Sequence, residues 1–145
     1  KAAVEFLKAQ TFVQADRIGI VGFCFGGRVA YLAACNLSDI KATVAFYGVN
    51  MLAPEGGIGP SPIEQTVNIT SPVLGLAGER DHLSPPEQTE KLEAELKKHG
   101  KTYEFHAYPN VGHGFVVDGN SRYDPEAAKD AWQRTWTWFD KYLKG

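Results

Sequence analysis

Arg17-Ile-Gly-Ile-Val-Gly-Phe-Cys-Phe-Gly-Gly27 contains the strongest structural signal in the chain. Its apolar part, residues 18–21, is typical of a buried strand, and a helix-favouring run, residues 28–34, follows directly after the glycines. Cys24 therefore lies between glycines at a turn from strand to helix, which is the layout of a nucleophile elbow. Glycines suit such a turn because its backbone is strained and neighbouring chain comes too close for Cβ atoms. The thiol would stand at a helix N-terminus, where the backbone dipole favours thiolate.

Composition limits the classes of protein to which the chain can belong. Its 145 residues are few enough for one domain, and a hydrophobic fraction of 43% can fill an ordinary core. A formal net charge of −2 without a basic stripe argues against a nucleic-acid partner. No apolar run approaches the roughly 20 residues that span a bilayer, and nothing resembles a signal peptide, so we expect no membrane partner.

The cysteines and histidines are too scattered for a disulfide framework or a metal site. Cys24 and Cys35 fall near opposite ends of one predicted helix, too far apart to bridge, which favours a reducing, cytoplasmic compartment. The four histidines are dispersed, and neither CxxC nor HExxH occurs, so we expect no metal.

Strand and helix patterns alternate along the whole chain, which indicates an α/β fold with a mostly parallel sheet. We treat residues 1–145 as a single domain. The predicted strands are residues 17–21, 42–47, 72–77 and 103–108. The predicted helices are residues 1–9, the segment from the elbow to about Cys35, residues 84–100 and a last helix after Asp124.

Several local signals refine this prediction. Residues 51–70 are rich in glycine and proline and should form a long surface loop. Ser84-Pro-Pro-Glu87 reads as a capping box, and Asp124 as the cap of the last helix. The helix after Ser84 should pack through Leu92 and Leu96. The expected packed stripe of the last helix, with both tryptophans in the core, is Ala128, Ala131, Trp132, Thr135, Trp136, Phe139 and Leu143.

Three residues that can carry chemistry follow predicted strands: Cys24, Asp81 and His113. In a parallel sheet the turns after the strands share one edge, so these side chains can converge there. The chain order nucleophile, acid, histidine is that of α/β-hydrolases. We expect His113 to take the thiol proton and Asp81 to orient the imidazole, while the thiolate attacks a carbonyl carbon. The Phe25 N–H would be one oxyanion-hole donor.

The remaining cysteine and histidines have simpler interpretations. Cys35 should be a small core residue. His82 is too near Asp81 in sequence to be oriented by it, and His99 lies where a helix dipole favours a cation. His106, on the last predicted strand, should be structural.

With these residues in place, the chain resembles the dienelactone hydrolase family, the carboxymethylenebutenolidase-like α/β-hydrolases. The resemblance runs from the first helix to the last and rests on residues 17–27, Gly78-Glu-Arg-Asp81, Gly112-His-Gly-Phe115 and residues 124–132. It implies hydrolysis of a lactone or carboxylic ester by a cysteine nucleophile, with neither metal nor organic cofactor. It also places Cys24, Asp81 and His113 in the family's triad positions.

Two departures from the family pattern matter. Relatives that act on dienelactone hold its carboxylate with arginines, one of them four residues after the histidine, whereas this chain has Val117 there and its nearest arginine is Arg122. Neutral or differently charged esters are therefore open as substrates. Phe25, Phe115 and Val117 suggest an apolar lining near the nucleophile. The family also has strands ahead of this region, including one beside residues 17–21 and the loop with the second oxyanion donor. We therefore expect a C-terminal part of a longer hydrolase, or an edge that pairs with another copy.

Two other functions stay open at this point. The chain could be a non-catalytic α/β-hydrolase module that binds a ligand or partner through the same cleft. It could also be a redox-sensitive thiol protein, because an activated Cys24 would oxidise readily.

Overall fold

The computed structural model describes residues 1–54, 56 and 59–144, and it contains a parallel sheet of four strands in the order β1-β2-β3-β4. The strands are β1 (Ile18–Phe23), β2 (Ile40–Phe46), β3 (Val73–Gly78) and β4 (Tyr103–Tyr108). The helices are α1 (Ala2–Lys8), α2 (Phe25–Asn36), α3 (Pro86–Lys98) and α4 (Pro125–Phe139), with a 3₁₀ helix η2 (Ile63–Asn68) and a π-helical turn η3 (Asp140–Lys144). The predicted α/β class with a parallel sheet is confirmed.

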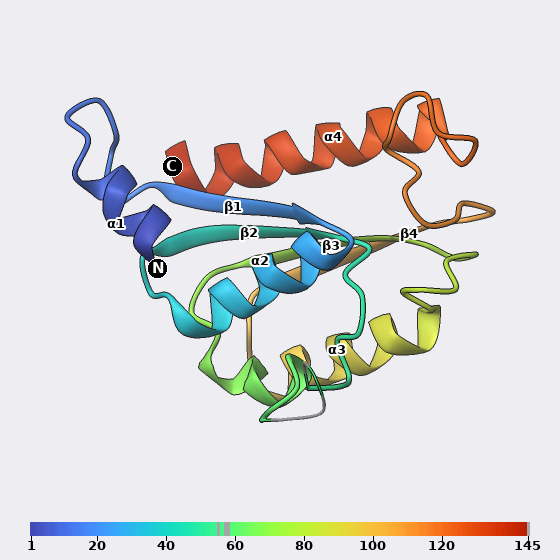
Figure 1. Cartoon of the computed structure of the whole chain (residues 1–145), viewed down its shortest axis with the longest axis horizontal. Coiled ribbons are helices and arrows are strands. Elements are labelled where there is room, and N and C mark those ends of the chain that lie inside the picture. The colour runs from blue at the N-terminus through green and yellow to red at the C-terminus, as the bar shows by residue number, and fades with distance from the viewer. Residues whose placement is uncertain (55, 57–58, 145) are drawn as a thin grey trace.

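The elements form three layers, with α4 on one face of the sheet and α2 and α3 on the other (Figure 1). All connections between successive strands run over the α2 and α3 face, as right-handed crossovers in a sheet of this strand order require. The carboxyl ends of the four strands therefore meet at one edge of the sheet. The register confirms this, because Phe23 pairs with Phe46, and Phe46 pairs with Leu76.

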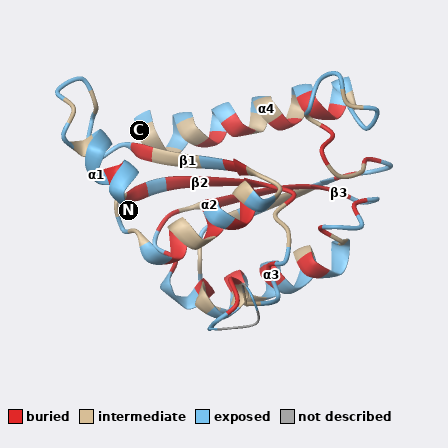
Figure 2. Ribbon diagram, viewed as in Figure 1, coloured by how far each residue is buried: buried red, intermediate tan, exposed pale blue. Residues whose placement is uncertain are grey.

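The two central strands carry the core (Figure 2). Six of the seven residues of β2 and all six residues of β3 are buried, as expected for parallel strands that are covered on both faces. On the α4 face, Val44, Phe46 and Leu76 pack with Phe115 and Ala131 in one cluster. The opposite face packs against α2 and α3 in a second cluster, which consists of Tyr31, Ala34, Cys35, Met51, Ile69, Val73, Leu92 and Leu96. The predicted packing of Leu92 and Leu96 is confirmed.

Two local predictions between β2 and α3 need correction. The segment of residues 51–70 is not a continuous loop, because η2 occupies its second half; residues 55, 57 and 58 of this segment lie outside the described residues. The capping box at Ser84 is wrong. The N-cap of α3 is Pro85, which has no capping side chain, while the Ser84 N–H donates to Asp81 Oδ1 at 2.9 Å. The Ser84 backbone N–H therefore belongs to the turn at Asp81 and not to a helix cap.

The last helix begins as predicted and buries Ala128, Ala131 and Thr135 of the predicted stripe, whereas the prediction that Trp136 lies in the core is wrong. Asp124 caps α4 by accepting a hydrogen bond from the Ala127 N–H at 2.9 Å. Trp138, not Trp136, is the buried tryptophan, and the side chain of Trp136 is 55% exposed. Trp132 is half-buried and stacks on Trp136 with ring centroids 5.4 Å apart. Trp132 lies against Phe23 of β1 and against the fully buried Phe46 of β2, so it borders the core while Trp136 lies outside it.

Among the described strands, β1 pairs only with β2, so one of its edges is open. β1 carries apolar side chains on both faces, and Val21 is exposed. The predicted unpaired edge of the elbow strand is thus present. Within the described residues, none of the helices is both long enough and apolar enough to cross a membrane.

Candidate active site

Cys24 occupies the sharp turn that joins β1 to α2. Its φ of 58° and ψ of −121° place a non-glycine residue in a strained region of backbone conformation, where it forms the N-cap of α2. The Cys24 N–H donates to the Phe46 carbonyl at 3.0 Å, and the Cys24 carbonyl accepts from the Gly27 N–H at 2.9 Å. These bonds fix the turn to the carboxyl end of β2 and leave a half-buried thiol at the start of the helix.

Two of the glycines around Cys24 are required by close backbone contacts. A Cβ atom on Gly22 would lie 1.9 Å from the Gly26 carbonyl oxygen, and one on Gly27 would lie 2.6 Å from the Phe46 carbonyl oxygen. A Cβ atom on Gly26 would meet nothing within 4 Å. The sequence prediction that glycine permits close approach is therefore confirmed for Gly22 and Gly27, whereas Gly26 has room for a side chain.

Asp81 is the buried acid at the end of β3, and its side chain is satisfied on both oxygens. Oδ1 accepts hydrogen bonds from the N–H groups of Leu83 at 2.8 Å and Ser84 at 2.9 Å. Oδ2 lies 2.7 Å from Nδ1 of His113. The two backbone bonds hold the carboxylate in one orientation, so Oδ2 is presented to the imidazole.

His113 lies on the loop after β4, which backbone bonds fasten to the loop of Asp81. The Glu79 N–H donates to the Tyr108 carbonyl at 3.0 Å, and the Arg80 N–H donates to the Val111 carbonyl at 2.9 Å. At Gly78 the two chains come so close that a Cβ atom would lie 2.3 Å from the Val111 carbonyl oxygen. This fastening explains how residues 32 positions apart maintain a 2.7 Å contact.

Tyr47 is a residue of this region that the sequence analysis did not single out. It follows β2, it has a left-handed φ of 36°, and its ring stands edge-on to the His113 imidazole at a centroid distance of 4.7 Å. Its buried hydroxyl has no hydrogen-bond partner among the described residues. Burial, with smaller contributions from the negative charges of Cys24 and Asp81, raises the pKa of Tyr47 to about 12. Its place directly after a strand, at the same edge as the other three, was the available sequence signal.

The structure therefore brings the predicted residues together to different degrees. Asp81 and His113 form a hydrogen-bonded pair, and Cys24 stands at the same edge of the sheet. In the described part of the chain, the Cys24 thiol makes no hydrogen bond to His113, so the step from thiol to imidazole stays a prediction. Phe25 is the first residue of α2, a position whose N–H has no acceptor within the helix. Its role as an oxyanion donor also stays a prediction.

Exposed apolar side chains occur within a few residues of each predicted catalytic residue in the sequence. The side chains of Phe25, Leu83 and Val117 follow the three predicted catalytic residues in sequence, and all three are exposed. Phe115, which we expected in the lining, is fully buried against Phe46 and cannot line an open site.

The other titratable candidates lie elsewhere. Cys35 is buried in the core as predicted, and burial raises the pKa of its thiol to about 12. His82 is exposed, whereas His99 is the C-cap of α3 and contacts Glu95 at 3.0 Å. His106 joins a polar cluster between β4 and α4. Within the described residues, no group of three or more His, Cys, Asp or Glu side chains is arranged to hold a metal ion.

Comparison with known proteins agrees with this arrangement. The model of the dienelactone hydrolase family matches residues 1–143. The chain is 36% identical over 142 residues to a protein of Methylorubrum extorquens named "Putative carboxymethylenebutenolidase", covering 97% of this chain and 48% of that protein. It is 34% identical over 145 residues to a Bradyrhizobium protein named "Probable 2-oxo-3-(5-oxofuran-2-ylidene)propanoate lactonase", covering 99% of this chain and 58% of that protein.

A solved structure supports the same relationship. The crystal structure of a "Putative Dienelactone Hydrolase" from Klebsiella pneumoniae superposes with a TM-score of 0.89 at 34% identity, covering 97% of this chain and 58% of that one. The chain thus spans about half the length of the relatives that it matches, between 48% and 58% in these three.

Proposed function

Because the chain belongs to the dienelactone hydrolase family, we propose that it carries the catalytic residues of a hydrolase that cleaves a lactone or carboxylic ester. In this proposal Cys24 is the nucleophile, His113 the general base and Asp81 the residue that orients His113. The observation that carries the proposal is the 2.7 Å contact between Asp81 Oδ2 and His113 Nδ1, at the same sheet edge as the strained Cys24 elbow.

The first half of the reaction forms a thioester. An Asp81 carboxylate beside Nδ1 favours the tautomer with the proton on Nδ1, which leaves Nε2 able to accept the thiol proton of Cys24. The thiolate attacks the carbonyl carbon of the ester, and the carbonyl π electrons move to oxygen, where the Phe25 N–H stabilises the negative charge. When the carbonyl re-forms, the bond to the leaving oxygen breaks, and the imidazolium of His113 returns its proton to that oxygen.

The second half reverses these roles with water. His113 Nε2 takes a proton from a water molecule, and the resulting hydroxide attacks the thioester carbonyl carbon. The carbon–sulfur bond then breaks, the proton that His113 held restores the thiol of Cys24, and the product leaves as a carboxylic acid that loses its own proton to water. The ionised Asp81 stabilises the imidazolium that exists between these steps.

The side chains near the site favour a substrate whose acyl group is uncharged. Val117 is 47% exposed and stands where relatives that act on dienelactone carry an arginine, so the chain offers no cation at that place for a substrate carboxylate. Phe25, beside the nucleophile, is 50% exposed and adds an apolar contact. We therefore propose neutral esters or lactones as substrates, with two cysteines that remain thiols in a reducing, cytoplasmic compartment.

The open edge of β1 supports a further part of the proposal. Unpaired N–H and C=O groups along an apolar strand favour pairing with another strand. We propose that this edge pairs either with a segment of a longer protein, in whose hydrolase domain residues 1–145 form the C-terminal part, or with a second copy of the chain. A monodisperse, well-folded monomer of residues 1–145 in solution would contradict both forms of pairing.

The test of the hydrolase proposal is intact-mass spectrometry after incubation with p-nitrophenyl acetate. We expect one acetyl adduct with a burst of p-nitrophenol, absent in Cys24→Ala and retained in Cys35→Ala, which removes only the buried thiol. In the unaltered chain the adduct should decay slowly if a second oxyanion donor is missing. A folded chain without any adduct, or an adduct unaffected by Cys24→Ala, would contradict the proposal and favour a binding module.

A further inference from the structure

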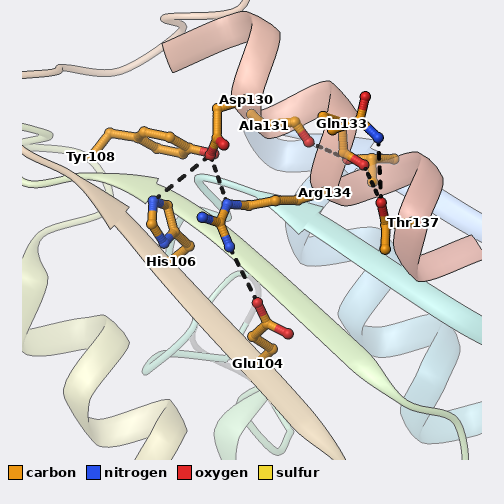
Figure 3. A network of polar contacts seen from close by, with 9 residues as sticks. Glu104, His106, Tyr108, Asp130, Ala131, Gln133, Arg134 and Thr137 are labelled. Carbon is orange, nitrogen blue, oxygen red and sulfur yellow. Dashed lines mark hydrogen bonds and ion pairs between the residues drawn. The ribbon is translucent and has the colours of Figure 1, made fainter. Parts of the chain in front are cut away.

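A cluster of polar side chains bridges β4 and α4 on the sheet face opposite α2 and α3 (Figure 3). Oδ2 of Asp130 accepts a hydrogen bond from the Tyr108 hydroxyl at 2.8 Å and another from Nε of Arg134 at 2.6 Å. Arg134 also contacts Glu104 through Nη1 at 3.4 Å, and Nε2 of His106 lies 3.9 Å from the same Asp130 oxygen. We call these five residues the Asp130 cluster.

Tyr108 is the member of the cluster that reaches into the core. It is 5% exposed, and its ring packs in the same apolar cluster as Phe115 and Ala131. Burial first, and then its hydrogen bond to Asp130, raise the pKa of Tyr108, so its hydroxyl keeps its proton and donates at ordinary pH. Arg134 is the main cause of the lowered pKa of Asp130, so the acceptor stays ionised. The hydrogen bond therefore connects a buried neutral donor to a charged acceptor on α4.

Tyr108 and Phe115 are the buried aromatic residues at the two ends of segment 108–115, which contains His113. Their ring centroids lie 5.1 Å apart, and Phe115 is completely buried. Both ends are fastened to α4, because Tyr108 donates to Asp130 and the Phe115 carbonyl accepts from the Asp124 N–H at 3.0 Å. The position of His113 between these ends therefore depends on where α4 holds them.

A continuous line of ring contacts leads from the Asp130 cluster to the imidazole. Phe115 lies 5.6 Å from Tyr47, and Tyr47 lies 4.7 Å from His113, both measured between ring centroids. Close-packed rings transmit small displacements because there is no empty space between them to absorb a shift. We propose that Asp130 is a positioning residue for His113 and acts on it through Tyr108 and Phe115. The inference rests on the proposed role of His113 as the general base.

The test reads the His113 side chain directly. The ring C–H signals of His113, identified by their loss in His113→Gln, are followed by carbon–proton correlation NMR across a pH titration. Tyr108→Phe removes only the hydroxyl, and Asp130→Ala removes the acceptor. We expect both variants to shift the His113 signals and their titration midpoint. Thr137→Val is the control, since it changes α4 outside the cluster, and its His113 signals should match those of the unaltered chain.

A second measurement follows Cys24 alkylation by iodoacetamide as a function of pH. We expect Tyr108→Phe and Asp130→Ala to slow the alkylation of Cys24 at neutral pH by about tenfold. This lies within the roughly 10²-fold loss of rate that a misplacement of about 1 Å can cause. Asp130→Asn keeps an oxygen acceptor for the Tyr108 hydroxyl and should restore most of the rate.

Three results would overturn the inference. His113 signals and alkylation profiles that stay unchanged in Tyr108→Phe and Asp130→Ala, with only the melting temperature lowered, would leave the cluster a purely structural feature. An Asp130→Asn variant as impaired as Asp130→Ala would show that the hydrogen bond from the Tyr108 hydroxyl is not what connects residue 130 to His113. A Thr137→Val variant with the same shifts would show that any change in α4 has this effect. Because the NMR signals need no ester turnover, they still decide the matter if the hydrolase proposal fails.

Discussion

Replacing Asp81 by asparagine is expected to lower the rate of Cys24 acylation by about 10²–10⁴ without unfolding the chain. The amide has the size of the carboxylate, and its oxygen can still accept from the N–H groups of Leu83 and Ser84, which are 2.8 and 2.9 Å from Asp81 Oδ1. The opposite orientation would place the amide NH₂ against two N–H donors. The turn therefore selects the orientation that directs the NH₂ toward His113.

That orientation is what impairs the imidazole. An NH₂ group 2.7 Å from Nδ1 needs a lone pair there, so the proton moves to Nε2, which can then no longer accept the thiol proton. Loss of a hydrogen bond to a charged group costs about 1.5–3 kcal/mol. At about 1.36 kcal/mol for each factor of ten, this corresponds to about 10- to 150-fold. The wrong tautomer raises the loss toward about 10⁴, the value for the equivalent change in a serine triad.

The assay is the p-nitrophenol burst with p-nitrophenyl acetate, run beside thermal unfolding of each variant. Asp16→Asn, which changes an exposed carboxylate ahead of β1, at the end of this strand away from Cys24, is the control and should acylate at the unaltered rate. His113→Ala should be at least as slow as Asp81→Asn. If Asp81→Asn acylates within about threefold of the unaltered chain while His113→Ala is inactive, the argument from the tautomer is wrong.

Three further predictions follow from the described contacts. Gly22→Ala should prevent the elbow from closing, because its Cβ atom would lie 1.9 Å from a carbonyl oxygen, whereas Gly26→Ala has open space and should keep or raise the melting temperature. Iodoacetamide at pH 8 should modify Cys24 and spare Cys35, whose pKa burial raises to about 12; peptide mass mapping that finds both modified would contradict this. Arg134 lowers the folded-state pKa of Asp130, so this carboxylate stabilises the fold above about pH 4, and the contribution is lost as pH falls through the lower folded pKa. The free energy of unfolding, measured with urea at several pH values, should show this loss in the unaltered chain and not in Asp130→Asn. The same dependence of that free energy on pH in both proteins would refute the prediction.

Sequence patterns were most informative where the physics is local. The apolar run before Cys24 predicted β1, and the glycines predicted an elbow whose contacts with Gly26 and Phe46 the structure then showed. Asp124 was identified as a cap because an N-cap bond reaches only three residues along the same chain. These features depend on neighbours within a turn of helix or strand, so the amino-acid order alone contains them.

Local patterns failed where a distant partner competed for the same group. Ser84 has the spacing of a capping box, yet its N–H is taken by Asp81 of the preceding turn. Trp136 and Trp138 are both apolar residues on α4 but lie on different faces of the helix, and the face that α4 turns toward the sheet is the one with Trp138. A helix pattern gives the spacing of a packed stripe, but the neighbouring layer selects which stripe is covered.

The order of amino acids was enough to predict the α/β class, the elbow at Cys24 and the chain order of Cys24, Asp81 and His113. The 2.7 Å contact of His113 with Asp81, the place of Tyr47 beside that imidazole and the cluster that connects Tyr108 to α4 became visible in the folded chain alone. This difference arises because secondary structure follows from interactions between residues close in the chain. Contacts among side chains at the ends of different strands depend instead on register, layer packing and loop conformation, which no single segment contains.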